Sequence, residues 1–350
     1  MQITPVFFND GFQALKDYIR DSQFSEIIVL LDDNTYEHCF TVLVQHLVGY
    51  ELRLINIAPG EGSKSPEILH ELWHAMLEMK ADRNSLLINL GGGMITDVGG
   101  FLASTYKRGI SFVNVPTSLL AMVDASLGGK NGINVGGFKN QVGTFTSPDF
   151  TLIETEFLKT LPEREMLAGF AEMLKHGLIA DRIYWDVLKF LRADVPADNH
   201  TDWTVYIKRS VEIKTTIVEN DFYEQKARKT LNFGHTLGHA IESYFSDKSP
   251  ILHGEAVAVG MILEAHMSVQ AGYLSEAEFS EIAYHISELY TKIELPSYED
   301  LRPYLVQDKK NVKGSLRFMP LLHIGKCSEI ASNATPGQIR RALESYSQES

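Results

Sequence analysis

Residues 88–101 read INLGGGMITDVGGF, and this stretch decides the fold class. Three consecutive glycines separate an apolar run, 85–90, from a segment with helical spacing, 94–106. We interpret the run as a buried strand that leads directly into a helix. At such a junction in a parallel sheet, ligands gather beside the helix amino terminus, and glycines let a phosphate approach the backbone. The alternative is that the glycines form only a tight turn.

The same alternation of strand and helix extends over the first third of the chain. It predicts further strands over 26–31, 52–57 and 109–115, with helices over 35–48 and 66–80. Strands that alternate with helices pair in parallel, so we expect an α/β N-terminal domain with a parallel Rossmann-like sheet over residues 1–160. After that point the apolar spacing is mostly helical, which predicts a mainly α-helical C-terminal domain over 161–350.

Composition excludes several classes of function. The 350 residues carry a net charge of −13, which argues against a nucleic-acid partner. No window approaches the length of apolar sequence that a membrane span needs, and the first residues do not resemble a signal peptide. Two cysteines far apart in sequence suggest a reducing compartment. We therefore expect a cytoplasmic protein.

The glycine stretch departs from the standard dinucleotide fingerprint. Gly91 and Gly93 match its first two glycines, but Thr96 stands at the third, and no acidic residue lies near position 113. Polar residues that follow the first two predicted strands could complete a nucleotide site, and these are Asp32, Glu61 and Lys64.

Candidate metal ligands lie in the second half of the chain. In LNFGHTLGHAIES (231–243), His235 and His239 are four residues apart and share one helix face, and His253 follows in LHGEAVAVGM (252–261). Imidazoles with one carboxylate and an open position form the ligand set of a catalytic zinc. Spacing alone does not choose the ligands: one histidine of the pair could carry a proton instead, and three side chains compete for the remaining position, Glu172, His176 and Glu255.

Basic and amide side chains are scattered around these motifs. A glycine-rich segment, 116–145, and the stretches before the histidines and near residue 310 contain Asp124, Lys130, Lys139, Asn140, Lys214, Arg228, Lys309 and Lys310. Each alone is an ordinary surface residue. Together with the nucleotide and metal patterns, they favour a substrate that carries phosphate, carboxylate or both.

Five motifs in this order closely resemble 3-dehydroquinate synthases, over residues 25 to 327: GGGMITDVGGF, PTSLLAMVDASLGGKNGIN, GFAEMLKHG, LNFGHTLGHAIE and LHGEAVAVGM. The resemblance implies a lyase that depends on NAD and on zinc, with cobalt as the other metal. Such an enzyme converts 3-deoxy-D-arabino-heptulosonate 7-phosphate into 3-dehydroquinate and phosphate. It does so by transient oxidation at C5, phosphate elimination, re-reduction, ring opening and an intramolecular aldol closure.

The resemblance also implies roles for individual residues. The metal ligands would be Glu172, His235 and His253, which moves His239 to the substrate site. The other substrate positions would be Asp124, Lys130, Asn140, Lys175, Lys214, Arg228, Asn232 and Lys310, with Lys310 favoured over Lys309. The dinucleotide positions would be Asp32, Asn34, Glu61, Lys64, Gly92, Gly93, Asp97, Thr117, Ser118, Lys130, Lys139 and Thr160. The family is usually homodimeric, with an arginine at the position of Arg108 that reaches the neighbouring site.

Some positions depart from the family pattern. Ser118 and Met122 replace the commoner Thr and Gln, and Thr96 stands where Gly is frequent. Related sugar phosphate cyclases differ among the substrate contacts, and here Lys214, Arg228 and Asn232 match the dehydroquinate type. The remaining alternatives are a metal-dependent polyol dehydrogenase, another sugar phosphate cyclase, or a catalytically silent binding protein on the same scaffold.

Overall fold

The computed structural model describes residues 4–9, 11–136, 138–191, 201–246, 248–306 and 316–348. The chain forms two compact units. The first unit comprises Met1–Pro162 and Pro196–Ile207, and the second comprises Glu163–Val195 and Lys208–Ser350. Among the described residues, none of the helices combines the length and apolar character needed to cross a bilayer.

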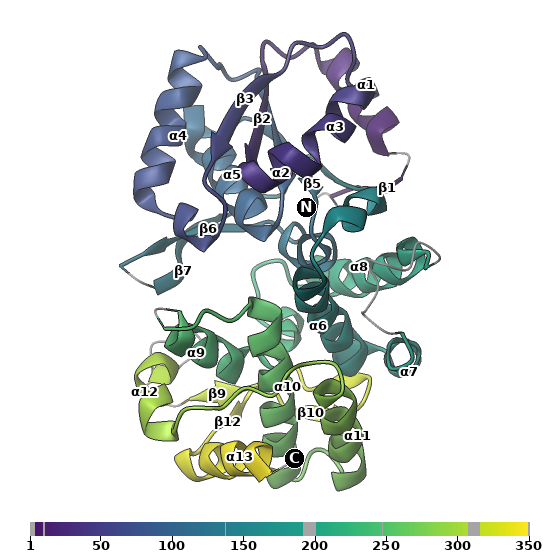
Figure 1. Cartoon of the computed structure of the whole chain (residues 1–350), viewed down its shortest axis with the longest axis vertical. Helices are drawn as coiled ribbons and strands as arrows, with labels where there is room; N and C mark the ends of the chain where they lie inside the picture. Colours follow the sequence, from purple (N-terminus) through teal and green to yellow (C-terminus); the bar gives the residue numbers. More distant parts are fainter. Residues whose placement is uncertain are drawn as a thin grey trace. The chain divides into compact units, whose positions relative to one another are not determined.

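A six-stranded sheet forms the centre of the first unit (Figure 1). Its order is β1-β8-β5-β4-β2-β3, and all neighbouring strands are parallel, as predicted. The strands are β1 (Val6–Phe8), β2 (Ile27–Asp32), β3 (Arg53–Ile57), β4 (Leu86–Gly91), β5 (Ser111–Pro116) and β8 (Phe150–Ile153). Every residue of β2, β4 and β8 is buried, which explains their continuous apolar sequences.

The helices of the first unit are α1 (Gly11–Ser22), α2 (Asp33–His38), α3 (Phe40–His46), α4 (Pro66–Glu78) and α5 (Gly93–Thr105). Pro66 is the first residue of α4, as predicted, and Ser65 caps the helix by accepting a hydrogen bond from the backbone N–H of Ile68. The single helix predicted over 35–48 is wrong, because α2 ends at His38 and α3 begins at Phe40, with Cys39 between them. Side chains from α4 and α5 pack with Leu30 and Leu87 of the sheet in one apolar core.

The chain order changes direction between β2 and β4. From β2 the chain moves outward to β3, whereas β4 lies on the other side of β2 and leads on to β5. In doubly wound sheets this switch point opens a crevice beyond the carboxyl ends of the two strands, where ligands bind. Asp32 ends β2 and Gly91 ends β4, so the predicted nucleotide residues stand at the switch point.

The glycine-rich segment contains a π-helical turn, Ala121–Ala125, and an antiparallel hairpin of β6 (Lys130–Val135) and β7 (Phe138–Phe145). The hairpin was not predicted, because glycine has low strand propensity. Two glycines are needed where the strands face each other: a Cβ on Gly143 would lie 2.2 Å from the carbonyl oxygen of Asn131, and one on Gly132 would lie 3.0 Å from that of Val142.

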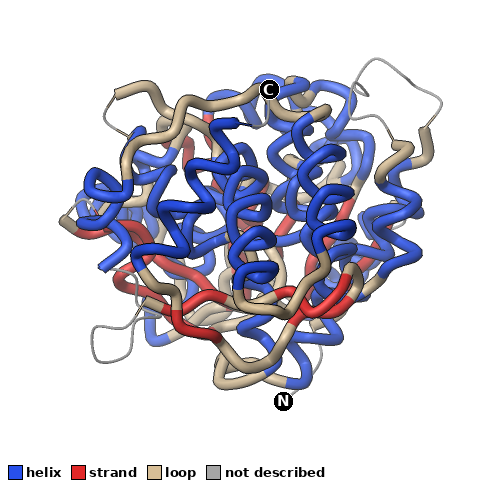
Figure 2. The backbone as a smooth tube through the Cα atoms, turned by 90° about the horizontal axis from the view of Figure 1, so that it is seen from below, coloured by secondary structure: helices blue, strands red, loops and turns tan. Residues whose placement is uncertain are grey.

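Helices, blue in Figure 2, make up most of the second unit, as predicted. They are α6 (Glu163–Ala180), α7 (Arg182–Leu188), α8 (Trp203–Asn220, whose first turn belongs to the first unit), α9 (His235–Phe245), α10 (His253–Gln270), α11 (Glu276–Ser287), α12 (Tyr298–Val306) and α13 (Pro336–Gln348). Short strands accompany them: β9 (Arg317–Phe318), β10 (Leu321–His323), β11 (Lys326–Cys327) and β12 (Ser332–Asn333). Helix α10 is at the centre and contacts α6, α9, α11 and α13.

Candidate active site

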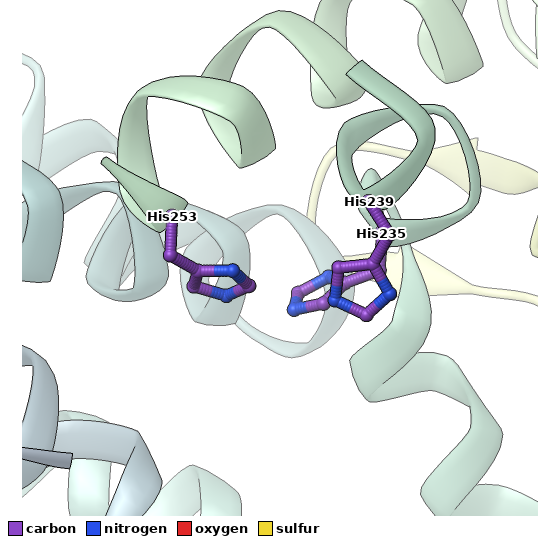
Figure 3. Close-up of side chains that lie close together, drawn as sticks. All are labelled: His235, His239 and His253. Carbon is purple, nitrogen blue, oxygen red and sulfur yellow. The ribbon is translucent and has the colours of Figure 1, made fainter. Parts of the chain in front are cut away.

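Three histidines and one glutamate from three helices meet in the second unit. Glu172 lies in the middle of α6, His235 begins α9 with His239 one turn later, and His253 begins α10. Figure 3 shows the three imidazole rings turned toward one another. Their ligand nitrogens all lie within 4.8 Å of one another, and Glu172 is fully buried.

The distances fit a tetrahedral metal. Glu172 Oε1 is 3.4 Å from His235 Nε2 and 3.6 Å from His253 Nε2. Bonds of about 2.0–2.1 Å to a tetrahedral zinc place neighbouring ligand atoms about 3.3–3.4 Å apart. Glu172 Oε1 therefore lies at ligand spacing from both imidazole nitrogens, and the nitrogens of the three histidines are also close enough to share an ion.

The other nitrogen of each of these two rings is engaged. His235 Nδ1 is 3.1 Å from the carbonyl oxygen of Phe233, and His253 Nδ1 is 3.2 Å from Glu242 Oε2. Acceptors at Nδ1 fix the tautomer that leaves Nε2 available to a metal. Burial opposes a charged His253, but the carboxylates of Glu242 and Glu172 outweigh burial and raise its pKa to about 10. The two carboxylates therefore favour a positive charge at this ring, either a proton or a metal ion that displaces the proton.

Glycines of α10 allow the three helices that carry the cluster to approach one another. A Cβ on Gly254 would lie 2.1 Å from the carbonyl oxygen of Ala168 in α6, and one on Gly260 would lie 1.9 Å from that of Gly234, which precedes α9. Real Cβ atoms do not approach that closely. The absence of these two side chains therefore sets the separation of the three helices that carry the cluster.

Three cationic side chains are buried in the same unit. Lys175 and Lys214 are 1% and 5% exposed, and Arg228 is 2% exposed. Lys175 Nζ forms an ion pair with Glu172 Oε2. Buried charges are costly unless they are compensated, and this ion pair compensates Lys175.

The loop before α9 shapes the surroundings of Arg228. Its guanidinium donates to the Phe222 carbonyl at 2.6 Å, and its backbone N–H donates to Asp221 at 3.1 Å. Asn232 Nδ2 donates to Glu224 Oε1 at 2.6 Å, and Glu224 has a left-handed backbone with φ of 57°. A non-glycine residue in that conformation is uncommon, and such residues gather at functional sites.

In the first unit, Lys64 brings four predicted positions together. The side chain is only 4% exposed, and its Nζ lies 2.7 Å from Asp97 Oδ2, 2.5 Å from Asn140 Oδ1 and 3.7 Å from Glu61 Oε1. Asn134, which sequence analysis did not single out, donates to Glu61 at 2.9 Å and ties the hairpin to this group. The cluster lies just beyond β3 and at the start of α5, near the switch point.

The triple glycine has more than one role. Gly92 caps α5 without a side-chain hydrogen bond, so the helix amino terminus keeps backbone N–H groups for a ligand. Gly91 is required by packing instead, because a Cβ there would lie 2.5 Å from Ile95. A Cβ on Gly93 would meet Ala125 at 3.0 Å. Of the three glycines, Gly92 has the most open surroundings for the expected phosphate, because the atom nearest to a Cβ placed there is Ser118 Oγ at 3.3 Å.

The remaining predicted residues occupy several environments. Asp32 caps α2 by accepting from Thr35 N at 2.9 Å, which gives it a structural role beside any ligand contact. Thr117 is buried, the residues of intermediate burial are Ser118, Asp124, Lys139, Asn232 and His239, and those exposed are Asn34, Arg108, Lys130 and Thr160. Lys309 and Lys310 lie outside the described residues.

Two family models match the chain in succession. The model of the 3-dehydroquinate synthase N-terminal region matches residues 54–168, and that of the C-terminal region matches residues 169–311. A 3-dehydroquinate synthase of Parabacteroides distasonis is 39% identical over 345 residues, which covers 97% of each chain. The chain belongs to the 3-dehydroquinate synthase family. The resemblance found in the five sequence motifs is therefore confirmed.

Solved structures agree with this membership of the 3-dehydroquinate synthase family. The 2-epi-5-epi-valiolone synthase ValA of Streptomyces hygroscopicus, solved with NAD⁺ and Zn²⁺, is 25% identical, with a TM-score of 0.88 over 100% of this chain and 98% of that one. A glycerol dehydrogenase of Schizosaccharomyces pombe shares the fold at 16% identity, with a TM-score of 0.63 over 98% and 89% of the two chains.

Proposed function

We propose that this protein converts 3-deoxy-D-arabino-heptulosonate 7-phosphate into 3-dehydroquinate and inorganic phosphate. The observation that carries the proposal is the convergence of Glu172, His235 and His253 at the spacing of metal ligands, in a unit that also buries three cations. A metal held there would polarise a substrate hydroxyl, and beside anion-binding groups this would suit an oxidation by NAD that is coupled to loss of phosphate. The 39% identity to a 3-dehydroquinate synthase supports this substrate over others.

We assign the metal to Glu172, His235 and His253, with zinc preferred and cobalt as the alternative. The donor set of two imidazoles and one carboxylate, with room for a substrate oxygen, is that of a catalytic zinc site. When bound, the metal supplies a Lewis acid that lowers the pKa of a substrate hydroxyl. Glu242 and the Phe233 carbonyl hold the two rings in the orientation that this role needs.

We assign NAD to the first unit, as an NAD-binding domain over residues 1–160, and the metal and substrate to a domain over 161–350. Lys64, Asp97 and Gly92 form the core of the proposed dinucleotide site. The other proposed contacts are Asp32, Asn34, Glu61, Gly93, Thr117, Ser118, Lys130, Lys139 and Thr160. When bound, NAD supplies a hydride acceptor that is regenerated before product leaves.

We assign the anionic groups of the substrate to the buried cations. Arg228, whose guanidinium the Phe222 carbonyl holds in place, suits a planar carboxylate or a phosphate, and Lys175 and Lys214 neutralise further charge. Further contacts proposed from the resemblance are Asp124, Lys130, Asn140, Asn232, His239 and Lys310. His239, a half-buried imidazole next to the metal ligands, is suited to hold or move a proton.

We also propose a cytoplasmic homodimer, in which Arg108 reaches the neighbouring site. Arg108 is exposed in a turn with φ of 72°, which is compatible with a contact to a second chain.

Two alternatives are less well supported. A polyol dehydrogenase shares the fold, but at 16% identity, and it has little use for buried cations around the metal. Another sugar phosphate cyclase is disfavoured because the valiolone synthase is 25% identical whereas the dehydroquinate synthase is 39% identical.

The test compares wild-type protein with His235→Ala. Both would be loaded with zinc and NAD, mixed with the heptulosonate phosphate, and assayed for free phosphate and bound metal. We expect wild-type protein to release phosphate and the variant to lose both metal and phosphate release. Full zinc occupancy in the variant would refute the ligand assignment, and wild-type protein that binds zinc without releasing phosphate would refute the substrate.

A further inference from the structure

A buried carboxylate on the central helix, α10, contacts the start of α9, the helix that carries His235. Glu264 lies on α10 and is fully buried. Its Oε1 accepts from the backbone N–H groups of Thr236 at 2.8 Å and Leu237 at 3.1 Å, and its Oε2 accepts from Gly234 at 3.0 Å. These donors flank His235, the first residue of α9.

The amino terminus of α9 needs such an acceptor. Its cap residue is Gly234, which has a left-handed backbone with φ of 79° and offers no side-chain hydrogen bond. The first N–H groups of a helix have no partner within the helix, and leaving them buried and unsatisfied is costly. A carboxylate from α10 satisfies three donors at once, and its negative charge suits the positive end of the α9 dipole.

The backbone contact described above makes this arrangement rigid. Gly260 lies one turn before Glu264 on α10 and touches the Gly234 carbonyl, so the two helices cannot slide without breaking that contact. On the other side of His235, its Nδ1 is oriented by the Phe233 carbonyl. The residues before and after His235 are therefore both fixed to neighbouring groups.

We propose that Glu264 is a positioning residue for the metal site: by capping α9 from α10, it fixes the backbone of His235 before any metal binds. This inference rests on the proposed role of His235 as a metal ligand. Glutamine is an imperfect substitute, because its single carbonyl oxygen satisfies one or two of the three donors and its NH₂ group faces the rest.

The experiment measures the zinc dissociation constant by competition with a chromophoric chelator, together with the rate of zinc loss. Glu264→Gln is expected to bind zinc about tenfold more weakly and to lose it faster, as for other groups that orient metal ligands. The matched control is Ser268→Ala, one turn further along α10, where a buried hydroxyl accepts from Leu321 N at 3.0 Å and donates to the Glu264 backbone carbonyl at 2.8 Å, so the variant leaves the bonds of the Glu264 carboxylate in place. That variant should lose stability while its zinc affinity stays at the wild-type value.

The outcomes separate the two proposals. If Glu264→Gln binds zinc within twofold of wild type while His235→Ala loses it, the positioning role is overturned and the ligand assignment stands. If His235→Ala keeps wild-type affinity, the ligand assignment fails, and the positioning role fails with it. Equal weakening in Glu264→Gln and Ser268→Ala would show a general effect of stability and would also overturn the positioning role.

A measurement on wild-type protein covers the case in which Glu264→Gln does not fold. Amide hydrogen exchange in metal-stripped protein should show Thr236 and Leu237 as strongly protected as the middle of α10. Rapid exchange at both residues, with protection gained only when zinc is added, would mean that the metal orders α9 and would contradict the proposal.

Discussion

Replacing Gly260 with alanine tests how the helix packing controls the metal site. The new Cβ would lie 1.9 Å from the Gly234 carbonyl oxygen and 2.8 Å from the Gly238 nitrogen. Both are backbone atoms, so no side chain can rotate away. Because Cβ atoms essentially never come closer than 3.0 Å to another heavy atom, α9 and α10 must separate by about 1.1 Å at this point.

That displacement exceeds what the cluster tolerates. Ligand distances in metal sites vary by only about 0.2 Å, so His235 would leave the coordination shell unless α9 rotates to compensate. We expect Gly260→Ala to lose about 3 kcal/mol of unfolding free energy, at the upper end for over-packing. We also expect zinc to bind at least about tenfold more weakly, by analogy with the loss of a group that orients a ligand.

Thermal denaturation and chelator competition would measure both effects. The control is Gly337→Ala in α13, where the nearest atom to a new Cβ is the flexible end of Arg341 at 3.6 Å. Alanine should stabilise that helix by up to about 1 kcal/mol and leave zinc affinity unchanged. Wild-type stability and zinc affinity in Gly260→Ala would refute the claim that this backbone contact sets the geometry of the site.

Three further predictions concern charged groups of the second unit. Glu242→Gln removes the carboxylate acceptor of His253 Nδ1 and should weaken zinc binding about 10- to 100-fold in chelator competition; unchanged affinity would exclude the orienting role. Arg228→Ala should weaken substrate binding by about 2–5 kcal/mol while NAD binding stays the same, and an unchanged substrate dissociation constant in calorimetry would count against the anion contact. Burial opposes ionisation of Glu255, but its bonds to Arg164 and a backbone N–H lower its pKa below the usual glutamate value. The pair therefore stabilises the fold at neutral pH and loses this contribution as the pH falls through the lowered pKa. Glu255→Gln should lower the free energy of unfolding, measured by urea denaturation, by about 1 kcal/mol at pH 7 and by less in acid. An equal loss at both pH values would contradict the assignment.

Much of the first unit could be predicted because its central strands are fully buried. The apolar runs of β2, β4 and β5 lie within one or two residues of the predicted ranges, and so does the more exposed edge strand β3. The edge strand β1 and the short β8 have only three and four residues, too few to show a pattern. The β6–β7 hairpin was not predicted, because Gly132 and Gly143 lower the strand propensity of the segment. They are present because the two backbones approach closely at these positions.

The proposed site could be predicted from residues that are close in sequence, but the contacts from distant residues that support it could not. Helical spacing placed His235 and His239 on one face, and the motifs selected Glu172. Glu242 and Glu264 were missed, because what gives each its importance is a contact to a residue 11 to 30 positions away. An acidic residue within an otherwise apolar helical stretch was the signal that could have drawn attention to both.

The most direct test of the account follows phosphate release and the NADH absorbance band together, with NAD supplied far below the heptulosonate phosphate. The account predicts that phosphate release runs to completion, with many turnovers per NAD and no lasting rise in NADH. Release that stops after one equivalent of NAD is consumed, with NADH left in solution, would contradict an internally closed redox cycle.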